Sequence, residues 1–351
     1  MKNKYTTYIL ISVLFIVSFI LIFANLSNNY LWQDEGESAV LARNTLKFGY
    51  PRAFDGVNFV NPRIHAGFGE NYEWKHHPWL HFYPIALSYA ILGENAFSSR
   101  LPFAIMGFLS IVILFFLSKR LFKKESVAFL SVLFASTSIP FLLHTRQCRY
   151  YGLQAFLVLA IIWIYLNVLQ KRKKYMWHLG ILLTALYYTN HGAFIPVFGT
   201  IFIHFFLINK EKSLWKNFSF MCVAIFLLTL PWFIYSYSPK HLAILNPMML
   251  KKNLGFQIRV LNKYIFPLFF FLILYLSRSL KKKSWKTHVK QGDKFGLKLI
   301  LLLVAVNISF YTIVEQRTIR YYVHLFPFLY ILQAWIFATF LLKRKILGIA
   351  L

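Results

Sequence analysis

The stretch YILISVLFIVSFILIFANLSNNYLWQDE, residues 8–35, places an uncharged apolar run directly before an acidic pair, Asp34-Glu35. As a helix, residues 8–26 are long enough to cross the hydrocarbon core of a bilayer, which is about 30 Å thick. Lys2 and Lys4 precede the run, and it has no small-x-small cleavage site. The sequence therefore predicts an uncleaved membrane anchor, with carboxylates emerging on the far side of the membrane.

Similar apolar runs recur along the whole chain. The 351 residues are 58% hydrophobic and 19% aromatic, with a mean hydropathy of +0.54. Soluble domains average only about 45–50% apolar residues. We therefore expect an all-α polytopic membrane protein with about ten transmembrane helices. The expected spans are residues 8–26, 101–118, 126–143, 151–169, 176–190, 193–208, 218–236, 264–278, 297–314 and 322–342.

Basic residues predict the orientation of these spans. The chain has 39 Lys+Arg against 11 Asp+Glu, a formal charge of +28. The positive residues gather in short loops after every second span, which is typical of the cytoplasmic side. Because the charge is spread over loops, it does not indicate nucleic-acid binding. The N- and C-termini are both predicted to be cytoplasmic. The basic loops are residues 119–124, 171–174, 210–216, 281–286 and 343–345.

The alternation of basic loops also bears on the apolar run Pro78–Leu92, which is too short for an ordinary span. We interpret it as an interfacial or re-entrant helix on the outer surface. Residues 27–100 then form one large first extracytoplasmic loop, which also contains a short helix over Glu37–Phe48 that ends at Gly49-Tyr50-Pro51. A second outer loop is expected at 237–263. We expect a single transmembrane domain over 1–351, with no separate soluble C-terminal domain.

Acidic residues are concentrated in the first outer loop. Seven of the eleven lie there: Asp34, Glu35, Glu37, Asp55, Glu70, Glu73 and Glu94. Of these, Glu37, Asp55 and Glu94 are interpreted as helix caps or surface charges. The centres of the predicted spans contain no Asp, Glu, Lys or Arg. Ion-coupled transporters bind their ions near the midplane, so this pattern argues against one.

The outer ends of the spans bring cations to the same predicted side as the acids. A carboxylate can deprotonate a hydroxyl, and convergent cations can hold a phosphate as it leaves. This combination suits transfer of a group from a lipid-linked phosphate. A divalent metal is an alternative role for Glu73, His77 and His81. The candidate cations and their neighbours are Lys75, His77, Arg146, Arg149, Tyr151, His191, Arg317 and Arg320.

Six short motifs occur in an order that resembles the GT-C glycosyltransferases. Within that superfamily they are most similar to the protein O-mannosyltransferase and aminoarabinose-transferase-like group. The resemblance covers about residues 30–330. The motifs are Trp32-x-Asp34-Glu35, His77-Pro78-x-Leu80 with Tyr83, Arg100-Leu101-Pro102, Arg146-Gln147-x-Arg149-x-Tyr151, Tyr188-Thr189-Asn190-His191 and Arg320-Tyr321-x-x-His324-x-x-Pro327.

The resemblance implies an inverting hexosyl- or pentosyltransferase with a polyprenyl-phosphate sugar donor. It further implies a glycan, lipid or protein as the acceptor and a location in a bacterial inner membrane. Asp34 matches the catalytic base, and Glu35 is its neighbour in a positioning or structural role. No cofactor is required. The donor phosphate is assigned to Arg149, Arg320, Lys75, His77 and His191, and the rest of the pocket to Glu73, Tyr151 and Arg146.

Two other classes of function remain open from the sequence. One is a transporter or flippase of lipid-linked glycans, which charged residues at the midplane would favour. The other is a non-catalytic assembly subunit, which loss of Asp34-Glu35 or of the outer arginines would favour. Within the glycosyltransferase class, an enzyme that ligates or polymerises glycans is a further alternative.

Overall fold

A computed structural model describes residues 4–60, 67–209, 211–236, 247–265, 291–314 and 317–340. The regular secondary structure of these residues is helical, with three isolated β-bridges and no β-strand among them, so the predicted all-α fold is confirmed. They fall into two compact units. We call Ile22–Leu109 with Leu143–Ala243 the acidic unit. The C-terminal unit comprises Met1–Leu21, Ser110–Leu142 and Ile244–Leu351.

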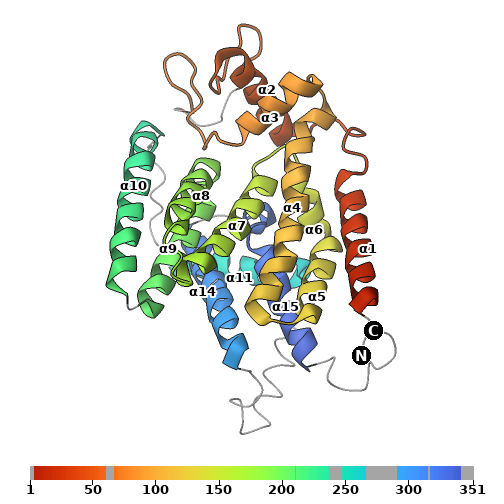
Figure 1. Ribbon diagram of the computed structural model, residues 1–351. Helices are drawn as coiled ribbons and strands as arrows, with labels where there is room; N and C mark the ends of the chain where they lie inside the picture. The colour runs from red at the N-terminus through yellow and green to blue at the C-terminus, as the bar shows by residue number, and fades with distance from the viewer. Residues whose placement is uncertain are drawn as a thin grey trace. The chain divides into compact units, whose positions relative to one another are not determined.

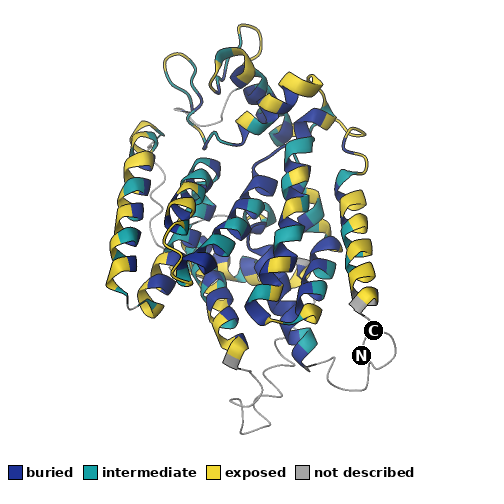
Figure 2. Ribbon diagram, in the orientation of Figure 1, coloured by how far each residue is buried: buried dark blue, intermediate teal, exposed yellow. Residues whose placement is uncertain are grey.

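In the part of the acidic unit that the structure describes, six helices are complete (Figure 1). Helix α2 packs against α3, α7 against α8, and α8 against α9 and α10. Helix α7 is buried along most of its length, whereas α10 exposes much of its surface (Figure 2). The helices are α2 (Gln33–Phe48), α3 (Phe82–Leu92), α7 (Tyr151–Leu169), α8 (Tyr175–Thr189), α9 (His191–Ile208) and α10 (Lys212–Ser236).

The C-terminal unit is built around α15, which packs against α5 and α14. Helix α11 lies in the segment expected to be the second outer loop. Its lysines lower the local hydropathy, so it does not resemble a span. Its polar residues serve to bind α14, because the Asn253 and Gln257 side chains each donate to Thr312 at 2.9 Å. The elements are α5 (Glu125–Ser136), α11 (Pro247–Tyr264), α14 (Gln291–Ile313), η2 (Ile319–Tyr322) and α15 (Phe326–Phe340).

Three helices run from one unit into the other: α1 (Lys4–Phe23), α4 (Ala96–Phe122) and α6 (Ile139–Thr145). Helix α4 begins earlier than the predicted span at 101–118, because Asn95 accepts a hydrogen bond from the Ser98 amide at 2.9 Å and caps the helix. Pro102, which a span at 101–118 would place in its first turn, lies inside the helix. Arg100 is therefore held on a formed helical turn.

Among the described residues, five helices are long and apolar enough to cross a membrane, or six if the bent pair α5–α6 is one span. The five are α4, α7, α9, α10 and residues 292–313 of α14. Helices α5 and α6 meet at 70°. The runs predicted at 8–26, 176–190 and 322–342 form the helices α1, α8 and α15. Most of the run at 264–278 lies outside the described residues. The number of spans and the side of the termini stay predictions.

Helix α2 carries the acidic pair. It begins at Gln33, four residues before the predicted start, so Asp34 and Glu35 occupy its first turn. Carboxylates there interact favourably with the positive end of the helix dipole, and Glu35 also accepts a bond from the Trp32 amide at 3.4 Å. As predicted, the helix ends at Gly49, whose φ of 83° is a left-handed conformation that favours glycine.

Candidate active site

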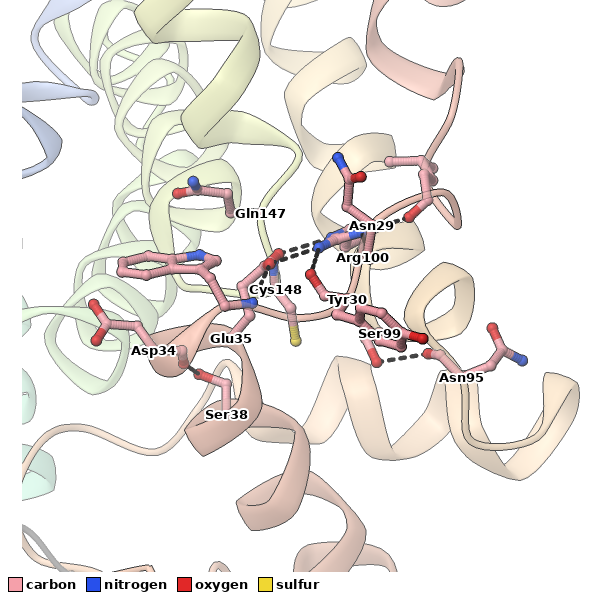
Figure 3. Close-up of polar contacts among 12 residues, drawn as sticks. Asn29, Tyr30, Asp34, Glu35, Ser38, Asn95, Ser99, Arg100, Gln147 and Cys148 are labelled. Carbon is pink, nitrogen blue, oxygen red and sulfur yellow. Dashed lines mark hydrogen bonds and ion pairs between the residues drawn. The ribbon is translucent and has the colours of Figure 1, made fainter.

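Glu35 forms a buried ion pair with Arg100. Only 1% of its side chain is exposed, and its two oxygens accept from Arg100 Nε at 2.9 Å and Nη2 at 2.7 Å (Figure 3). This two-point geometry is the strongest form of a carboxylate–guanidinium contact. It joins the first turn of α2 to α4.

Arg100 also organises the chain between α1 and α2. Its Nη1 donates to the backbone oxygens of Leu26 at 2.8 Å and Asn29 at 2.9 Å, and its Nη2 donates to that of Tyr30 at 3.1 Å. Together with the two bonds to Glu35, these contacts use all five N–H donors of the guanidinium. Because every donor is satisfied within the protein, we call this the Glu35–Arg100 hub and assign it a structural role.

The hub extends to the loop before α7. Glu35 Oε1 accepts a bond from the Cys148 amide at 2.8 Å. Two glycines bring the surrounding backbone close. A methyl group at Gly152 would lie 2.5 Å from the Thr145 oxygen, and one at Gly107 would lie 2.8 Å from Thr145 Cβ. The loop carrying the predicted arginines is therefore fixed against α2 and α4.

Asp34 points in a different direction from its neighbour. Its carboxylate turns away from the Glu35–Arg100 pair (Figure 3), and the residue is half-buried. Its backbone oxygen accepts from Ser38 Oγ at 3.2 Å and from Arg149 Nη1 at 3.1 Å. The predicted base and the predicted phosphate-binding arginine are therefore in contact through the backbone of the base.

Glu37 links Arg149 to His77. One oxygen of Glu37 lies 2.8 Å from Arg149 Nη1 and 3.0 Å from His77 Nε2. Arg149 is buried, and its Nη1 also donates to Ser38 Oγ at 3.0 Å. We call Glu37, His77 and Arg149 the Glu37 cluster. Glu37 had been interpreted as a cap or surface charge. The available signal was its position three residues after Asp34, which puts both on one helix face.

Arg149 and His77 stabilise the ionised form of Glu37. Burial acts to raise the pKa of Glu37, but the hydrogen bond with His77 and the charge of Arg149 together lower this pKa to about 2. Burial lowers the pKa of His77. At neutral pH, Glu37 is therefore ionised and His77 is neutral, with its Nε2–H donating to the carboxylate. The positive charge of the cluster resides on Arg149.

Two buried nitrogens near the predicted donor site make no hydrogen bond within the described part of the chain. They are Arg149 Nε and His191 Nε2. A buried N–H group without an acceptor is costly. His191 is the first residue of α9, and its ring lies 4.3 Å from that of Tyr187. The preceding Asn190 caps α9 by accepting from the Gly192 amide at 2.7 Å. The Glu37 cluster thus contains a donor available to a ligand, unlike the hub.

The remaining predicted residues occupy separate places. Lys75 Nζ lies 3.8 Å from the centre of the Tyr235 ring, beside Glu73. Arg146 donates to the Ala24 oxygen and lines a cavity of about 370 Å³ next to the hub. The Tyr151 ring lies 4.6 Å from that of Tyr150. Arg320 lies in η2 of the C-terminal unit, and its role in the site stays a prediction.

The candidate metal ligands do not form a common site. Across the residues that the structure describes, no three His, Cys, Asp or Glu side chains are arranged to hold one ion. The rings of His77 and His81 are 5.3 Å apart. The Glu73 carboxylate instead accepts from the Asn71 amide at 3.1 Å and from Asn71 Nδ2 at 3.2 Å. His77 is bound to Glu37.

The sequence matches a family model and a curated protein. The family model described as dolichyl-phosphate-mannose-protein mannosyltransferase matches residues 76–235. An uncharacterized protein of Aquifex aeolicus (strain VF5) is 24% identical over 221 residues, which are 62% of this chain and 42% of that protein.

Two crystal structures of ArnT from Cupriavidus metallidurans share the architecture. The apo structure has a TM-score of 0.61 at 18% identity, covering 96% of this chain and 60% of that one. The structure bound to undecaprenyl phosphate has a TM-score of 0.64 at 15% identity, covering 96% and 61%. The chain thus spans less than two thirds of these relatives. The predicted GT-C fold and the resemblance to that superfamily are confirmed.

Proposed function

We propose that this chain is an inverting membrane glycosyltransferase. It moves a sugar from a polyprenyl-phosphate-linked donor to an acceptor hydroxyl on the extracytoplasmic side of a bacterial inner membrane. The observation that carries the proposal is the contact between Asp34 and Arg149, at 3.1 Å from the backbone oxygen of the acid to the guanidinium. The family model and the ArnT-like fold support the same class of reaction.

Asp34 acts as the general base in this proposal. Its carboxylate accepts the proton of the acceptor hydroxyl as that oxygen attacks the anomeric carbon. A new C–O bond forms on the face opposite the phosphate, and the bond from the anomeric carbon to the phosphate oxygen breaks. Its electron pair leaves with the polyprenyl phosphate. Attack from the opposite face inverts the configuration at the anomeric carbon.

Arg149 stabilises the departing phosphate. Its Nη1 is occupied by Glu37, Ser38 and the Asp34 backbone, so its orientation is fixed before the donor arrives. The Nε–H remains for a phosphate oxygen. A pre-oriented donor of this kind stabilises developing negative charge at little reorganisation cost. Glu37 acts as a positioning residue, since it holds the guanidinium rather than the substrate. His77 in turn positions the Glu37 carboxylate.

His191 is the second group assigned to the phosphate, because its buried Nε2 lacks a partner among the described residues. Lys75 and Arg320 are further cations for the donor, and Tyr151 and Arg146 shape the surrounding pocket. The proposed reaction needs no cofactor. Its partners are the lipid-linked donor, the bilayer, and a glycan, lipid or protein acceptor.

The test uses the full chain in nanodiscs. Synthetic polyprenyl-phosphate sugars of several hexoses and pentoses are supplied, and release of polyprenyl phosphate is followed with and without membrane extract as acceptor. We expect release that depends on acceptor, falls by at least about 100-fold in Asp34→Asn and persists with EDTA. The matched control is Glu70→Gln, which removes an exposed acid of the same loop.

Transport of the lipid-linked sugar across a sealed vesicle without release of polyprenyl phosphate would instead assign the chain to the flippase class. Activity of Asp34→Asn equal to that of Glu70→Gln would remove Asp34 from the role of base. Loss of release in EDTA, restored by a divalent metal, would make the enzyme metal-dependent.

A further inference from the structure

A second pocket of the acidic unit has walls made mainly of aromatic side chains. Its volume is about 260 Å³, below the range of about 300–1,000 Å³ typical of sites for drug-sized ligands. It is therefore suited to one small ring. We call it the aromatic pocket, and the residues that matter here are Tyr50, Glu73, Trp79, Tyr83, Trp232 and Tyr235.

The walls of the aromatic pocket come from distant parts of the chain, which ring contacts and hydrogen bonds connect. Trp79 lies 5.5 Å from Tyr83 and 6.3 Å from Trp232, measured between ring centres. The Leu80 amide donates to the Tyr188 oxygen at 2.9 Å. Tyr188 Oη donates in turn to the Leu228 oxygen at 2.6 Å. The outer loop, α8 and α10 are thereby linked, so the pocket is built by the fold.

Glu73 supplies a charged group at this pocket. Burial acts to raise the pKa of Glu73, but hydrogen bonds from its own backbone amide and then from the side chain and amide of Asn71 lower this pKa below its ordinary value. Its carboxylate is therefore ionised at neutral pH. Antiparallel bridges Arg52–Glu73 and Phe68–Trp74 hold the backbone on both sides. Lys75 Nζ lies against Tyr235, so the local charge is nearly balanced.

Gly69 is required by the close packing around Glu73. A methyl group at this position would lie 2.3 Å from Glu73 Oε2 and 2.8 Å from Tyr235 Oη. Real Cβ atoms do not approach other atoms so closely. The backbone therefore passes directly beside the carboxylate and the tyrosine, and any larger residue must displace one of them.

These features select a ligand with an apolar face and hydroxyl groups at its edge. An isoprenoid has no use for an ionised carboxylate, and a carboxylate offers a phosphate no hydrogen-bond donor. Aromatic faces pack against C–H groups, while a carboxylate accepts hydrogen bonds from hydroxyls. The indole N–H of Trp232 is buried and has no partner among the described residues, which adds a donor.

We propose that the aromatic pocket binds a single neutral pyranose ring, packed against its aromatic walls with hydroxyls donating to Glu73. The proposal deepens the function proposed above and rests on it only for the source of the sugar. That source is the transferable sugar of the donor or a sugar of a glycan acceptor. Binding of the ring itself requires neither catalysis nor the lipid.

The first experiment measures sugar binding without turnover. Full-length protein in nanodiscs is titrated with methyl glycosides of mannose, glucose and galactose, and binding is followed by saturation-transfer NMR and tryptophan fluorescence. Inorganic phosphate and cyclohexanol are the control ligands. We expect at least one glycoside to bind, and Trp232→Ala or Glu73→Gln to weaken it by about tenfold or more.

The matched control is Trp177→Ala, which removes an exposed tryptophan from α8. Gly69→Ala and Trp232→Phe are second variants, so the test does not depend on one protein folding. Thermal unfolding and size-exclusion profiles identify folded variants. No binding of any glycoside to the wild type, or equal binding by all folded variants, would overturn the proposal. So would tighter binding of cyclohexanol than of every glycoside.

The second experiment identifies the source of the sugar. If Glu73→Gln raises KM for the lipid-linked donor alone, the ring belongs to the donor. A raised KM for the acceptor alone assigns it to the acceptor. Glycoside binding by a wild-type protein that shows no transferase activity would support the pocket while refuting the function. Turnover by the wild type without sugar binding would refute the pocket alone.

Discussion

The carboxylates of two carboxylate–arginine pairs lie two residues apart on α2, and the two pairs differ in how the guanidinium is satisfied. In the Glu35–Arg100 hub, every N–H of the guanidinium is bound to the protein. In the Glu37 cluster, Arg149 keeps a buried Nε–H without a partner among the described residues. A saturated guanidinium fixes the backbone, whereas an unsaturated one is prepared for a ligand. Charge and burial alone would not separate them, because both arginines are buried.

Substitution of Asp34, whose carboxylate turns away from the hub, is the strongest test of the contrast between a structural hub and a catalytic cluster. Asp34→Asn is expected to lower turnover by about 10²–10⁴-fold, the usual contribution of a general base. The thermal midpoint should match that of wild type. Rates of polyprenyl phosphate release and unfolding curves measure both. A drop in stability with normal turnover per folded molecule would assign Asp34 to the scaffold.

Arg149→Lys tests whether the guanidinium of the Glu37 cluster binds the donor phosphate. Lysine keeps the charge but cannot bind Glu37, Ser38 and a phosphate oxygen together. We expect a loss of about 10²–10³-fold in kcat, the cost of removing one oriented donor. The check is single-turnover kinetics with saturating donor, and Lys174→Arg on a basic loop is a control. Full activity of the lysine variant would contradict an oriented role.

Glu35→Gln tests the hub. Removing one partner of a buried ion pair leaves an uncompensated charge and destabilises a protein by about 3–5 kcal/mol. We expect a lower yield and a lower unfolding midpoint, with turnover per folded molecule within a few fold of wild type. Denaturant or thermal unfolding in detergent measures the loss. A stable but inactive Glu35→Gln would move the hub into the catalytic machinery.

Glu37→Gln is expected to have the smallest effect of these substitutions. Its effect on the unfolding midpoint should depend on pH. The pKa of Glu37 is lowered to about 2 in the folded protein, against an ordinary value near 4.3. Its ionised form therefore stabilises the fold above about pH 4.3, and this contribution is lost as the pH falls toward 2. We expect wild type and Glu37→Gln to differ in unfolding midpoint at pH 6 and to converge near pH 2.5.

The same variant also has a kinetic signature. Since Glu37 orients Arg149, Glu37→Gln should raise KM for the donor several-fold, and Glu37→Asp should restore part of the loss. A constant difference in midpoint across the pH range, with unchanged KM, would show that Glu37 has neither role.

Residue patterns predicted the architecture because the bilayer imposes it. The runs that became α4, α7, α9 and α10 are long and uncharged, and few alternatives bury such segments. Helix α11 was missed because its stabilising contacts, Asn253 and Gln257 to Thr312, are polar and distant in sequence. The start of α2 was placed too late because Trp32 is not a typical capping residue.

The site was predictable only in part. Asp34, His77 and Arg149 could be proposed from their motifs, but their mutual distances depend on the packing of α2 against the loop before α7. The local sequence does not distinguish the role of Glu35 from that of Asp34. Glu35 is the residue that binds Arg100, which lies 65 residues after Glu35 in the chain. Glu37 was read as a surface charge because its partners, His77 and Arg149, are 40 and 112 residues away.

The connectivity of the hub sets the order in which this protein can mature during synthesis. Glu35 bonds to Arg100 and to the amide of Cys148. Until residue 148 has been synthesised and has reached its place, the carboxylate lacks one of its native partners. The segment around Glu35 therefore lacks this contact while the two hydrophobic stretches before residue 148, at 101–118 and 126–143, are synthesised. An insertion factor that held the first helices together during this interval would protect the segment that carries Glu35.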